Sequence, residues 1–418
     1  MPRLRLLVAI VSTIAISTLP GVSPAGDLPA HQAALTLEAA VDLALDSNPD
    51  VRRARVAVQS AELALRGAGA PSANPAITVE GGPRFGAGGP EADVGVGIEV
   101  PFDLGATSRR RRTAASADLE AARARLAATE REVATSVRIS FAEAVAAVGR
   151  VRVAADAVAL DEEMERIARR RHELGEVSIL EPNFAALERA DAQRALLDAR
   201  VERARAYRAL RGLLALPAGT PIALPPPPPP VWPDGGPSES VLLEQAADHP
   251  ELVAAREVAR TAEADLEAAR GAGAPGLSAS GGWSREGDEA NLVIGGLRFE
   301  LPLQRNQLGV AEATGIAGTA GIDAEAAALA FPQDLAVALD AWEVAVARHA
   351  LAATDALPLA EQNLDLVMRA YEAGKEELLA VLLLQRQALD ARRAAIDAEL
   401  ELHRAAAALE RAAGQEVF

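Results

Sequence analysis

The sequence predicts an α+β fold in which long antiparallel helical hairpins alternate with short β-hairpins, and in which this unit is built twice. The phrase RGAGAP occurs at residues 66–71 and again at 270–275. Long runs rich in Ala, Arg, Glu and Leu, which favour helix, lie around both copies. Gly-rich stretches of alternating apolar and polar residues, which favour strands, follow each copy. With only 3% aromatic residues in 418, the chain is poorly suited to one large globular core.

The repeated phrase belongs to a longer repeat. Asn48 precedes the first copy and His249 precedes the second, 201 residues later, each followed by a proline. Gly175 and Gly374 lie after the copies in similar surroundings, 199 residues apart. Landmarks that recur at nearly constant spacing indicate an internal duplication.

Two repeats therefore divide the mature chain, at 26–224 and 238–418. Between them, residues 225–237 form a linker whose six consecutive prolines favour the stiff polyproline II conformation.

The first 25 residues are typical of a secretory signal peptide, with Arg3 and Arg5, an apolar run over 6–16 and small residues up to Ala25. A buried N-terminal helix is the alternative. Removal would take away two arginines and no acid, so the formal charge would change from −17 to −19. This acidity argues against a nucleic-acid partner. The chain has no cysteine, which excludes disulfides and thiolate metal sites.

The helical runs are unusually long. No proline occurs between Thr107 and Glu173, and a helix of about 65 residues would reach roughly 100 Å. Apolar residues in this run recur every three or four positions, as in a coiled coil. Each half has one Gly-containing break, at 172–180 and at 371–379, which we interpret as the tip of a helical hairpin. A simple kink is the alternative.

Four stretches of about ten residues alternate between apolar and polar residues, at 76–85, 92–102, 276–284 and 291–301. Each is long enough for a tilted membrane strand, although an ordinary half-buried strand has the same pattern. After the signal peptide, no stretch reaches the roughly 18 apolar residues of a transmembrane helix.

Four strands cannot close a membrane barrel, since the smallest have eight, and open strand edges are not tolerated in lipid. Several chains would have to share one barrel. Three copies would supply twelve strands, with the long helices arranged around the same axis, although composition does not fix the number three.

The order of these elements resembles the TolC family of outer-membrane efflux channels. The resemblance covers nearly all of residues 35–414. Its most diagnostic stretches are LTLEAAVDLALDSNPDVRRARVAV (35–58), YEAGKEELLAVLLLQRQALDAR (371–392) and LERAAG (409–414). EVPFDLGATSRRRR (99–112) is most similar to the heavy-metal-efflux branch of the family.

The resemblance implies a homotrimer in the outer membrane, with a barrel in contact with outer-membrane lipid and a helical tunnel across the periplasm. Its implied partners are a periplasmic adaptor protein and an inner-membrane transporter, which we expect to be proton-driven. The implied function is a passive exit duct for small molecules or metal cations. A duct for secreted proteins is an alternative within the same family, and a periplasmic coiled-coil adaptor or scaffold is an alternative of another class.

The resemblance also implies a constriction at the hairpin tips, where Tyr371 matches a tyrosine of the family's narrowest point. The positions of the family's acidic ring are Ala380 and Leu383 here, so that ring is absent. Other carboxylates near the tips are candidates for a gate, because threefold symmetry would make each into a ring. They are Glu176, Glu181, Glu376 and Glu377. Solvated surface acids are the alternative for each of them.

The resemblance further implies that the adaptor contacts the tips at Gly175 and Gly374. A basic quartet, Arg109, Arg110, Arg111 and Arg112, could bind lipid phosphates at the membrane interface, or form a solvated turn. Trp283 could belong to an aromatic girdle, or could pack internally.

The sequence supports no enzyme and no cofactor. The five histidines show no metal-ligand spacing, and no phosphate-binding loop, nucleophile elbow or catalytic dyad occurs.

Overall fold

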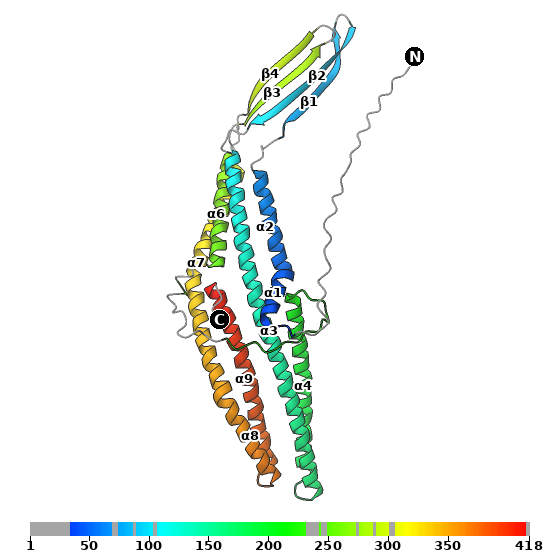
Figure 1. Cartoon of the computed structure of the whole chain (residues 1–418), viewed down its shortest axis with the longest axis vertical. Coiled ribbons are helices and arrows are strands. Elements are labelled where there is room, and N and C mark those ends of the chain that lie inside the picture. The colour runs from blue at the N-terminus through cyan, green and yellow to red at the C-terminus, as the bar shows by residue number, and fades with distance from the viewer. Residues whose placement is uncertain are drawn as a thin grey trace, which may run out of the picture.

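The computed structural model describes residues 34–68, 74–86, 89–102, 107–230, 242–243, 249–272, 276–286, 290–300 and 306–414. The expected signal peptide, the last residues of each RGAGAP phrase and residues 231–237 of the linker lie outside this part of the chain. The molecule is elongated, with a β-sheet at one end and the tips of two helical hairpins at the other (Figure 1).

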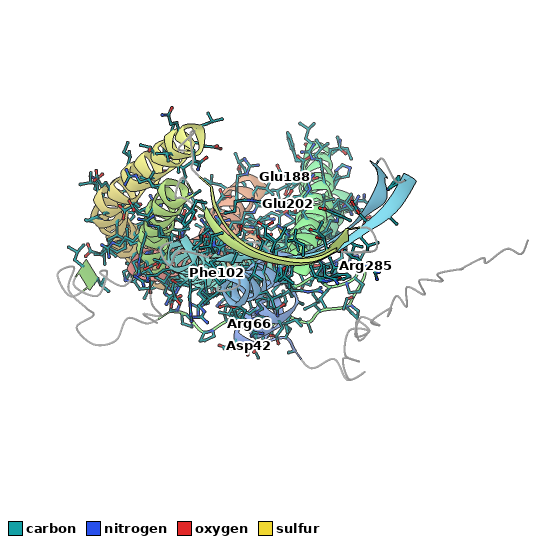
Figure 2. All side chains as sticks on the ribbon, turned by 90° about the horizontal axis from the view of Figure 1, so that it is seen from above. Asp42, Arg66, Phe102, Glu188, Glu202 and Arg285 are labelled. Carbon is teal, nitrogen blue, oxygen red and sulfur yellow. The ribbon has the colours of Figure 1, made fainter. Side chains whose placement is uncertain are left out.

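The four expected strands are confirmed and form one antiparallel sheet in chain order. They are β1 (Ala76–Gly86), β2 (Gly89–Phe102), β3 (Gly276–Glu286) and β4 (Ala290–Glu300). Pairing of β2 with β3 joins the two halves of the chain into a single sheet, which is curved when seen from above (Figure 2).

The register gives the sheet two different faces, because residues directly opposite each other in an antiparallel pair point to the same side. Ile98 lies opposite Ile77, and Val96 lies opposite both Val79 and Trp283. The apolar face carries Ile77, Val79, Val94, Val96, Ile98, Trp283, Val293, Leu297 and Phe299, all exposed in the single chain. The polar face carries Thr78, Glu80, Asp93, Glu99, Ser278, Ser280, Ser284 and Arg298, with Leu292 and Ile294 among them.

In the first half, α1 (Leu37–Ser47) and α2 (Pro49–Ala68) precede the first β-hairpin, and α3 (Thr107–Glu173) and α4 (Leu180–Leu213) follow it. Helix α3 is one continuous helix of 67 residues, because it has no proline and is dominated by good helix formers. Helix α2 ends within the first RGAGAP phrase, as expected from its glycines.

In the second half, α6 (Pro250–Gly271) precedes the sheet strands, and α7 (Gln307–Ala350), η2 (Leu351–Ala356), α8 (Leu357–Glu372) and α9 (Leu378–Ala413) follow. The break expected at 371–379 lies between α8 and α9, and the preceding helical run also contains a π-helical segment, η2, that was not predicted from the sequence. Pro358 explains it. A proline has no N–H to donate and its ring clashes with the carbonyl four residues earlier, which the wider π turn relieves.

Two equivalent hydrophobic cores lie beside each other in the middle of the molecule. The first contains Val51, Val137, Phe141, Ala144 and Leu210. The second contains Leu252, Ala338, Trp342, Ala345 and Leu409, each 199 to 201 residues later than its counterpart. The internal duplication is therefore visible in the packing as well as in the sequence.

Asn48 and His249 perform the same task in the two halves with different chemistry. The Asn48 side chain accepts a hydrogen bond from the Asp50 amide and donates one to the Leu213 carbonyl. His249 Nδ1 accepts from the Glu251 amide, so its Nε2–H is the group that donates to the Arg411 carbonyl, at 2.9 Å. Each side chain caps the start of one helix and binds the end of another.

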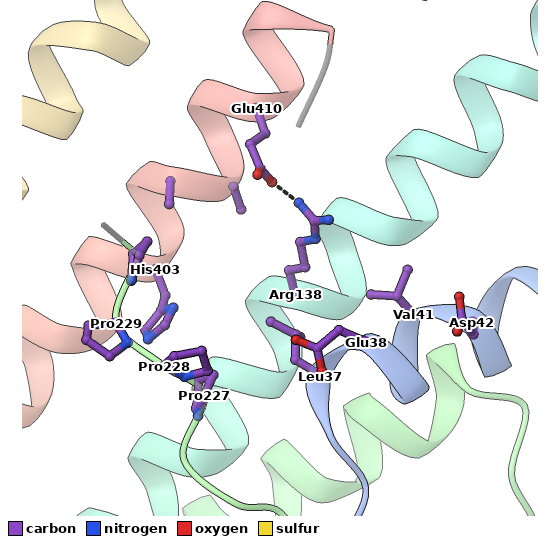
Figure 3. Close-up of a pocket in the computed structure, with 13 residues that line it drawn as sticks. Leu37, Glu38, Val41, Asp42, Arg138, Pro227, Pro228, Pro229, His403 and Glu410 are labelled. Carbon is purple, nitrogen blue, oxygen red and sulfur yellow. Dashed lines mark hydrogen bonds and ion pairs between the residues drawn. The ribbon is translucent and has the colours of Figure 1, made fainter. Parts of the chain in front are cut away.

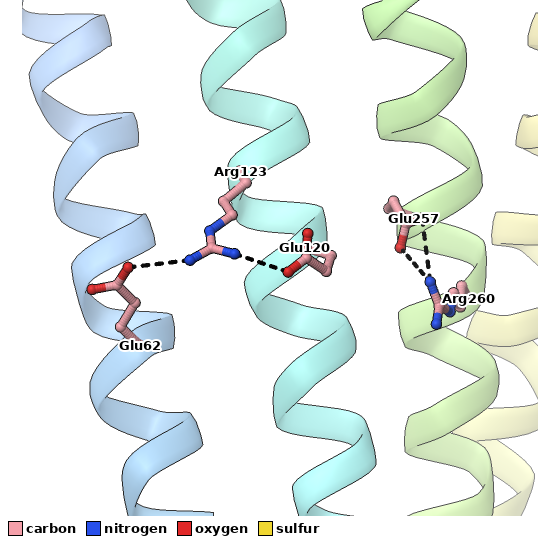
Figure 4. Close-up of polar contacts among 5 residues, drawn as sticks. All are labelled: Glu62, Glu120, Arg123, Glu257 and Arg260. Carbon is pink, nitrogen blue, oxygen red and sulfur yellow. Dashed lines mark hydrogen bonds and ion pairs between the residues drawn. The ribbon is translucent and has the colours of Figure 1, made fainter. Parts of the chain in front are cut away.

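Surface ion pairs contribute less than these cores. Arg123 on α3 lies 3.5 Å from Glu62 on α2 and 3.0 Å from Glu120 on its own helix, while Glu257 and Arg260 pair along α6 (Figure 4). Exposed pairs of this kind are worth about 0–1 kcal/mol each. Helix association therefore depends mainly on buried Ala, Val and Leu side chains.

The end of α4 contains a correctable strain. Ala215 has a φ of 52°, the left-handed conformation that its counterpart Gly414 adopts at the end of α9 with a φ of 70°. Left-handed backbone costs a non-glycine residue about 1–2 kcal/mol, more than glycine loses in chain entropy. We expect Ala215→Gly to increase the free energy of unfolding by about 0.5 kcal/mol and so to raise the apparent melting temperature. Ala190→Gly, within the exposed face of α4, should lower it instead, and a lower melting temperature for Ala215→Gly would contradict the assignment.

Candidate functional site at the hairpin tips

The two hairpin tips have the same backbone turn. In the first, Gly175 has a φ of 77°, its amide donates to the His172 carbonyl, and the Glu176 amide donates to the Arg171 carbonyl. In the second, Gly374 has a φ of 69° and the corresponding bonds go to Tyr371 and Ala370. This is the Schellman motif, in which a left-handed glycine ends the helix. Both glycines are thus confirmed as turn residues rather than kinks.

A polar cluster connects the two hairpins just above their tips. Tyr371, at the end of α8, is fully buried, and its hydroxyl donates a hydrogen bond to Glu181 Oε1 on α4 at 2.8 Å. Arg171 on α3 donates to the same carboxylate oxygen at 3.3 Å, and its guanidinium lies 4.9 Å from the centre of the Tyr371 ring. One carboxylate therefore receives donors from both hairpins.

Burial and the hydrogen bond to Glu181 raise the pKa of Tyr371 to about 12. Tyr371 consequently stays protonated at physiological pH and keeps donating to Glu181. A hydrogen bond to a charged acceptor contributes about 1.5–3 kcal/mol, more than a neutral pair.

The other acids predicted near the tips are placed differently. Glu176 lies 3.4 Å from Arg171 Nε but is about half exposed, and Glu376 and Glu377 are exposed on the second tip. Arg171 was not among the residues predicted from the sequence. Its only local indication was the basic last turn of the long helix, and its role depends on Tyr371, which lies 200 residues away.

A second contact between the hairpins is buried. Gln385 Nε2 on α9 donates to Asp161 Oδ1 on α3 at 2.5 Å, and both residues are buried. Burial raises the pKa of Asp161. Around it, Met164 and Ala168 of the first hairpin pack with Leu364 and Val381 of the second. The hairpins are therefore joined by an apolar core containing two polar contacts.

The predicted membrane-interface residues lie at the opposite end of the molecule. Trp283 is exposed on the apolar face of the sheet. In the basic quartet, Arg109 and Arg112 are exposed, while Arg110 lies against Gly271 of α6, whose added Cβ would be 2.9 Å from Arg110 Cδ.

The proline segment crosses the middle of the molecule. Pro227, Pro228 and Pro229 lie beside His403 of α9, next to a cavity of about 530 Å³ that the ion pair between Arg138 and Glu410 borders (Figure 3). Burial lowers the pKa of His403, with a further contribution from His349. Within the part of the chain that the structure describes, no group of three or more His, Asp or Glu side chains is placed to hold a metal ion.

The described helices include none with a segment apolar and long enough to cross a membrane. A curved sheet with one apolar and one polar face, continuous with two long helical hairpins, defines a channel-type fold in which strands and helices form successive parts of one conduit.

The chain belongs to the outer membrane efflux protein family, whose model matches residues 40–216 and again 242–415. It is 27% identical over 327 residues to the cobalt-zinc-cadmium resistance protein CzcC of Cupriavidus metallidurans, covering 76% of each chain. The outer membrane channel CmeC of Campylobacter jejuni has a similar structure, with a TM-score of 0.76 and 16% identity over 95% of this chain and 93% of that one. The outer membrane protein VceC of Vibrio cholerae gives a TM-score of 0.74 and 19% identity over 91% and 97%.

The chain is therefore an outer-membrane efflux duct of the kind used by tripartite pumps, with a helical extension into the periplasm. Its family consists of channel proteins rather than enzymes, and family members work as trimers with adaptors and inner-membrane transporters. The expectation of a TolC-family channel is confirmed, and the periplasmic adaptor alternative is excluded.

Proposed function

We propose that three copies of this chain form a passive duct for metal cations, which a periplasmic adaptor connects to a proton-driven inner-membrane transporter. The observation that carries the proposal is a four-stranded sheet with two unpaired edges, attached to two helical hairpins that contact each other near their tips. Each repeat, 26–224 and 238–418, would supply one β-hairpin and one helical hairpin.

The strand edges support assembly. Within one chain β1 and β4 are edge strands, and unpaired backbone groups at such edges are costly in lipid. Pairing of β4 with β1 of the next copy would satisfy both edges. Three copies would close a barrel of twelve strands.

Apolar residues on the outer helices support the same arrangement. Helix α4 exposes Leu180, Leu187 and Val201 at seven- and fourteen-residue spacing, and α7 exposes Leu329 and Val344. The two helices lie on opposite sides of the protomer (Figures 1 and 2). Helix α4 of one copy could therefore pack against α7 of its neighbour, in the manner of a coiled coil.

The tip cluster supports a gate. Tyr371, Glu181 and Arg171 hold the two hairpins together at the periplasmic end, and separating them would widen the passage. Glu176, Glu376 and Glu377 would add negative charge at the entrance, which favours cations. The exposed tips at Gly175 and Gly374 would receive the adaptor.

The opposite end would anchor the duct. Trp283 would lie among lipids at the membrane boundary, and Arg109 and Arg112, near the start of α3, would meet lipid phosphates where the sheet joins the helices.

The cargo assignment rests on similarity to a cobalt-zinc-cadmium resistance protein together with the acidity of the chain, whose formal charge is −17. Deletion of the chain should make its host sensitive to cobalt, zinc and cadmium, and the chain supplied in trans should restore resistance. Tolerance to organic dyes and export of secreted proteins serve as controls. Loss of dye tolerance or of protein export, with unchanged metal tolerance, would assign the duct to another cargo.

A further inference from the structure

Three side chains meet on the polar face of the sheet. Arg298 Nη1 on β4 lies 2.9 Å from Glu99 Oε1 and 3.1 Å from Glu99 Oε2 on β2. Ser278 on β3, the strand between them, donates from Oγ to Glu99 Oε1 at 2.6 Å. The ion pair therefore bridges the two strands over the one that separates them.

The register places this group on the inside of a barrel. Ser278 pairs with Pro101 on one side and with Arg298 on the other, so these residues share a face with Glu99, two positions from Pro101. The opposite face carries most of the aliphatic and aromatic side chains of the sheet, among them Val96, Ile98 and Trp283. In a membrane barrel the apolar face contacts lipid and the polar face lines the aqueous lumen.

The group also lies at a particular level of the conduit. β2 ends at Phe102 and β4 at Glu300, shortly before α3 and α7 begin. Glu99 and Arg298 are therefore close to the junction at which ions pass from the helical tunnel into the barrel.

The ion pair of Glu99 and Arg298 lies on a face of the sheet where the described charged side chains are mostly acidic. Among the side chains that the structure describes on the polar face, the acids are Glu80, Asp93 and Glu99, and Arg298 is the single cation. Arg298 thus compensates the negative charge of Glu99 on this face.

We propose that Glu99 and Arg298 determine the ion selectivity of the channel, by keeping the junction between tunnel and barrel close to electrically neutral. The inference rests on the proposed assembly, in which three copies would place three such pairs around the lumen. Selectivity would then be set at this ring as well as at the tips.

Single-residue variants separate the two charges. Arg298→Gln leaves three uncompensated carboxylates and is expected to raise the cation-to-anion permeability ratio by roughly threefold, from screened Coulomb attraction over about 10 Å. Glu99→Gln leaves three guanidinium groups and should lower the ratio by about the same factor. The measurement is the zero-current potential of purified channels in planar bilayers under a potassium chloride gradient.

Two further variants control for structural damage. The double variant Glu99→Gln with Arg298→Gln restores the net charge and should return the ratio to that of the unmodified channel. Ser284→Ala, on the same face of β3 but outside this group, does not change the charge and should leave the ratio unchanged. Conducting channels whose ratio does not change in either single variant would overturn the proposal, as would a double variant that behaves like one single variant. Absence of any conductance in a Tyr371→Phe channel, in which the tip contact is removed, would instead contradict the proposed duct itself.

Discussion

Replacing Tyr371 with phenylalanine is expected to open the periplasmic end of the channel. The change removes the hydroxyl that donates to Glu181 across the two hairpins, while the buried ring and its packing remain. A hydrogen bond to a carboxylate contributes about 1.5–3 kcal/mol, so the closed state should lose roughly tenfold or more in population per contact. Single-channel recordings in planar bilayers should show a higher mean conductance, or more frequent open events.

Arg171→Ala should act in the same direction, because it removes the second donor to Glu181 together with the cation over the Tyr371 ring. The two substitutions share one carboxylate, so their combination should have less effect than the sum of the two.

The chain provides a matched control. Tyr207 on α4 is its only other tyrosine and also has an arginine, Arg211, over its ring at 5.8 Å, but it belongs to the core near the end of α4. Tyr207→Phe should leave conductance unchanged. Equal conductance in the Tyr371, Arg171 and Tyr207 variants would exclude the cluster as a gate.

Phe141→Ala should produce the largest loss of stability among single substitutions in the first core. Phe141 is fully buried between residues of α1, α2 and α4. Removing a buried phenylalanine costs about 3–5 kcal/mol, because transfer energy is lost and a cavity remains. For a chain of this size, the apparent melting temperature in detergent should fall by roughly 5–10 °C.

Phe141→Leu keeps most of the volume and should cost less than half as much. Val56→Ala, at an exposed position on α2, provides the surface control and should have little effect. A Phe141→Ala protein with an unchanged melting temperature would show that this core does not limit stability.

Local patterns in the sequence were enough to predict the four strands, the long helix α3 and both hairpin tips. Each of these patterns acts on the backbone over a few residues. Alternation of apolar and polar residues favours strands, absence of proline allows a continuous helix, and Gly175 and Gly374 adopt the positive φ that ends a helix. The π-helical segment before Pro358 was missed, although a proline is a local indication, because a proline near a helix start is also compatible with regular helix.

Contacts between residues far apart in the sequence could not be predicted from local patterns. Glu181 and Tyr371 were both candidates, but their hydrogen bond joins residues 190 positions apart, and Arg171 was not recognised. The hydrogen bond between Asp161 and Gln385 joins α3 to α9. In the sequence, the helix faces that carry these two residues have the same pattern as faces exposed to solvent. Such pairs depend on which helices become neighbours, which the periodicity of one helix does not specify.

The duplication explains where the halves have diverged. Asn48 and His249 cap equivalent helices with an amide and an imidazole, and Phe141 and Trp342 occupy equivalent core positions. These substitutions keep the role of each position. At the tips the halves differ in role, since Glu181 accepts the cross-hairpin bonds whereas its counterpart in the second half is Ala380.

The assembly of three chains around one conduit is tested most directly by native mass measurement on protein extracted from separated membrane fractions. We expect the chain to be recovered from the outer membrane as a complex with the mass of three mature chains. A monomer released with the soluble contents of the periplasm would contradict it.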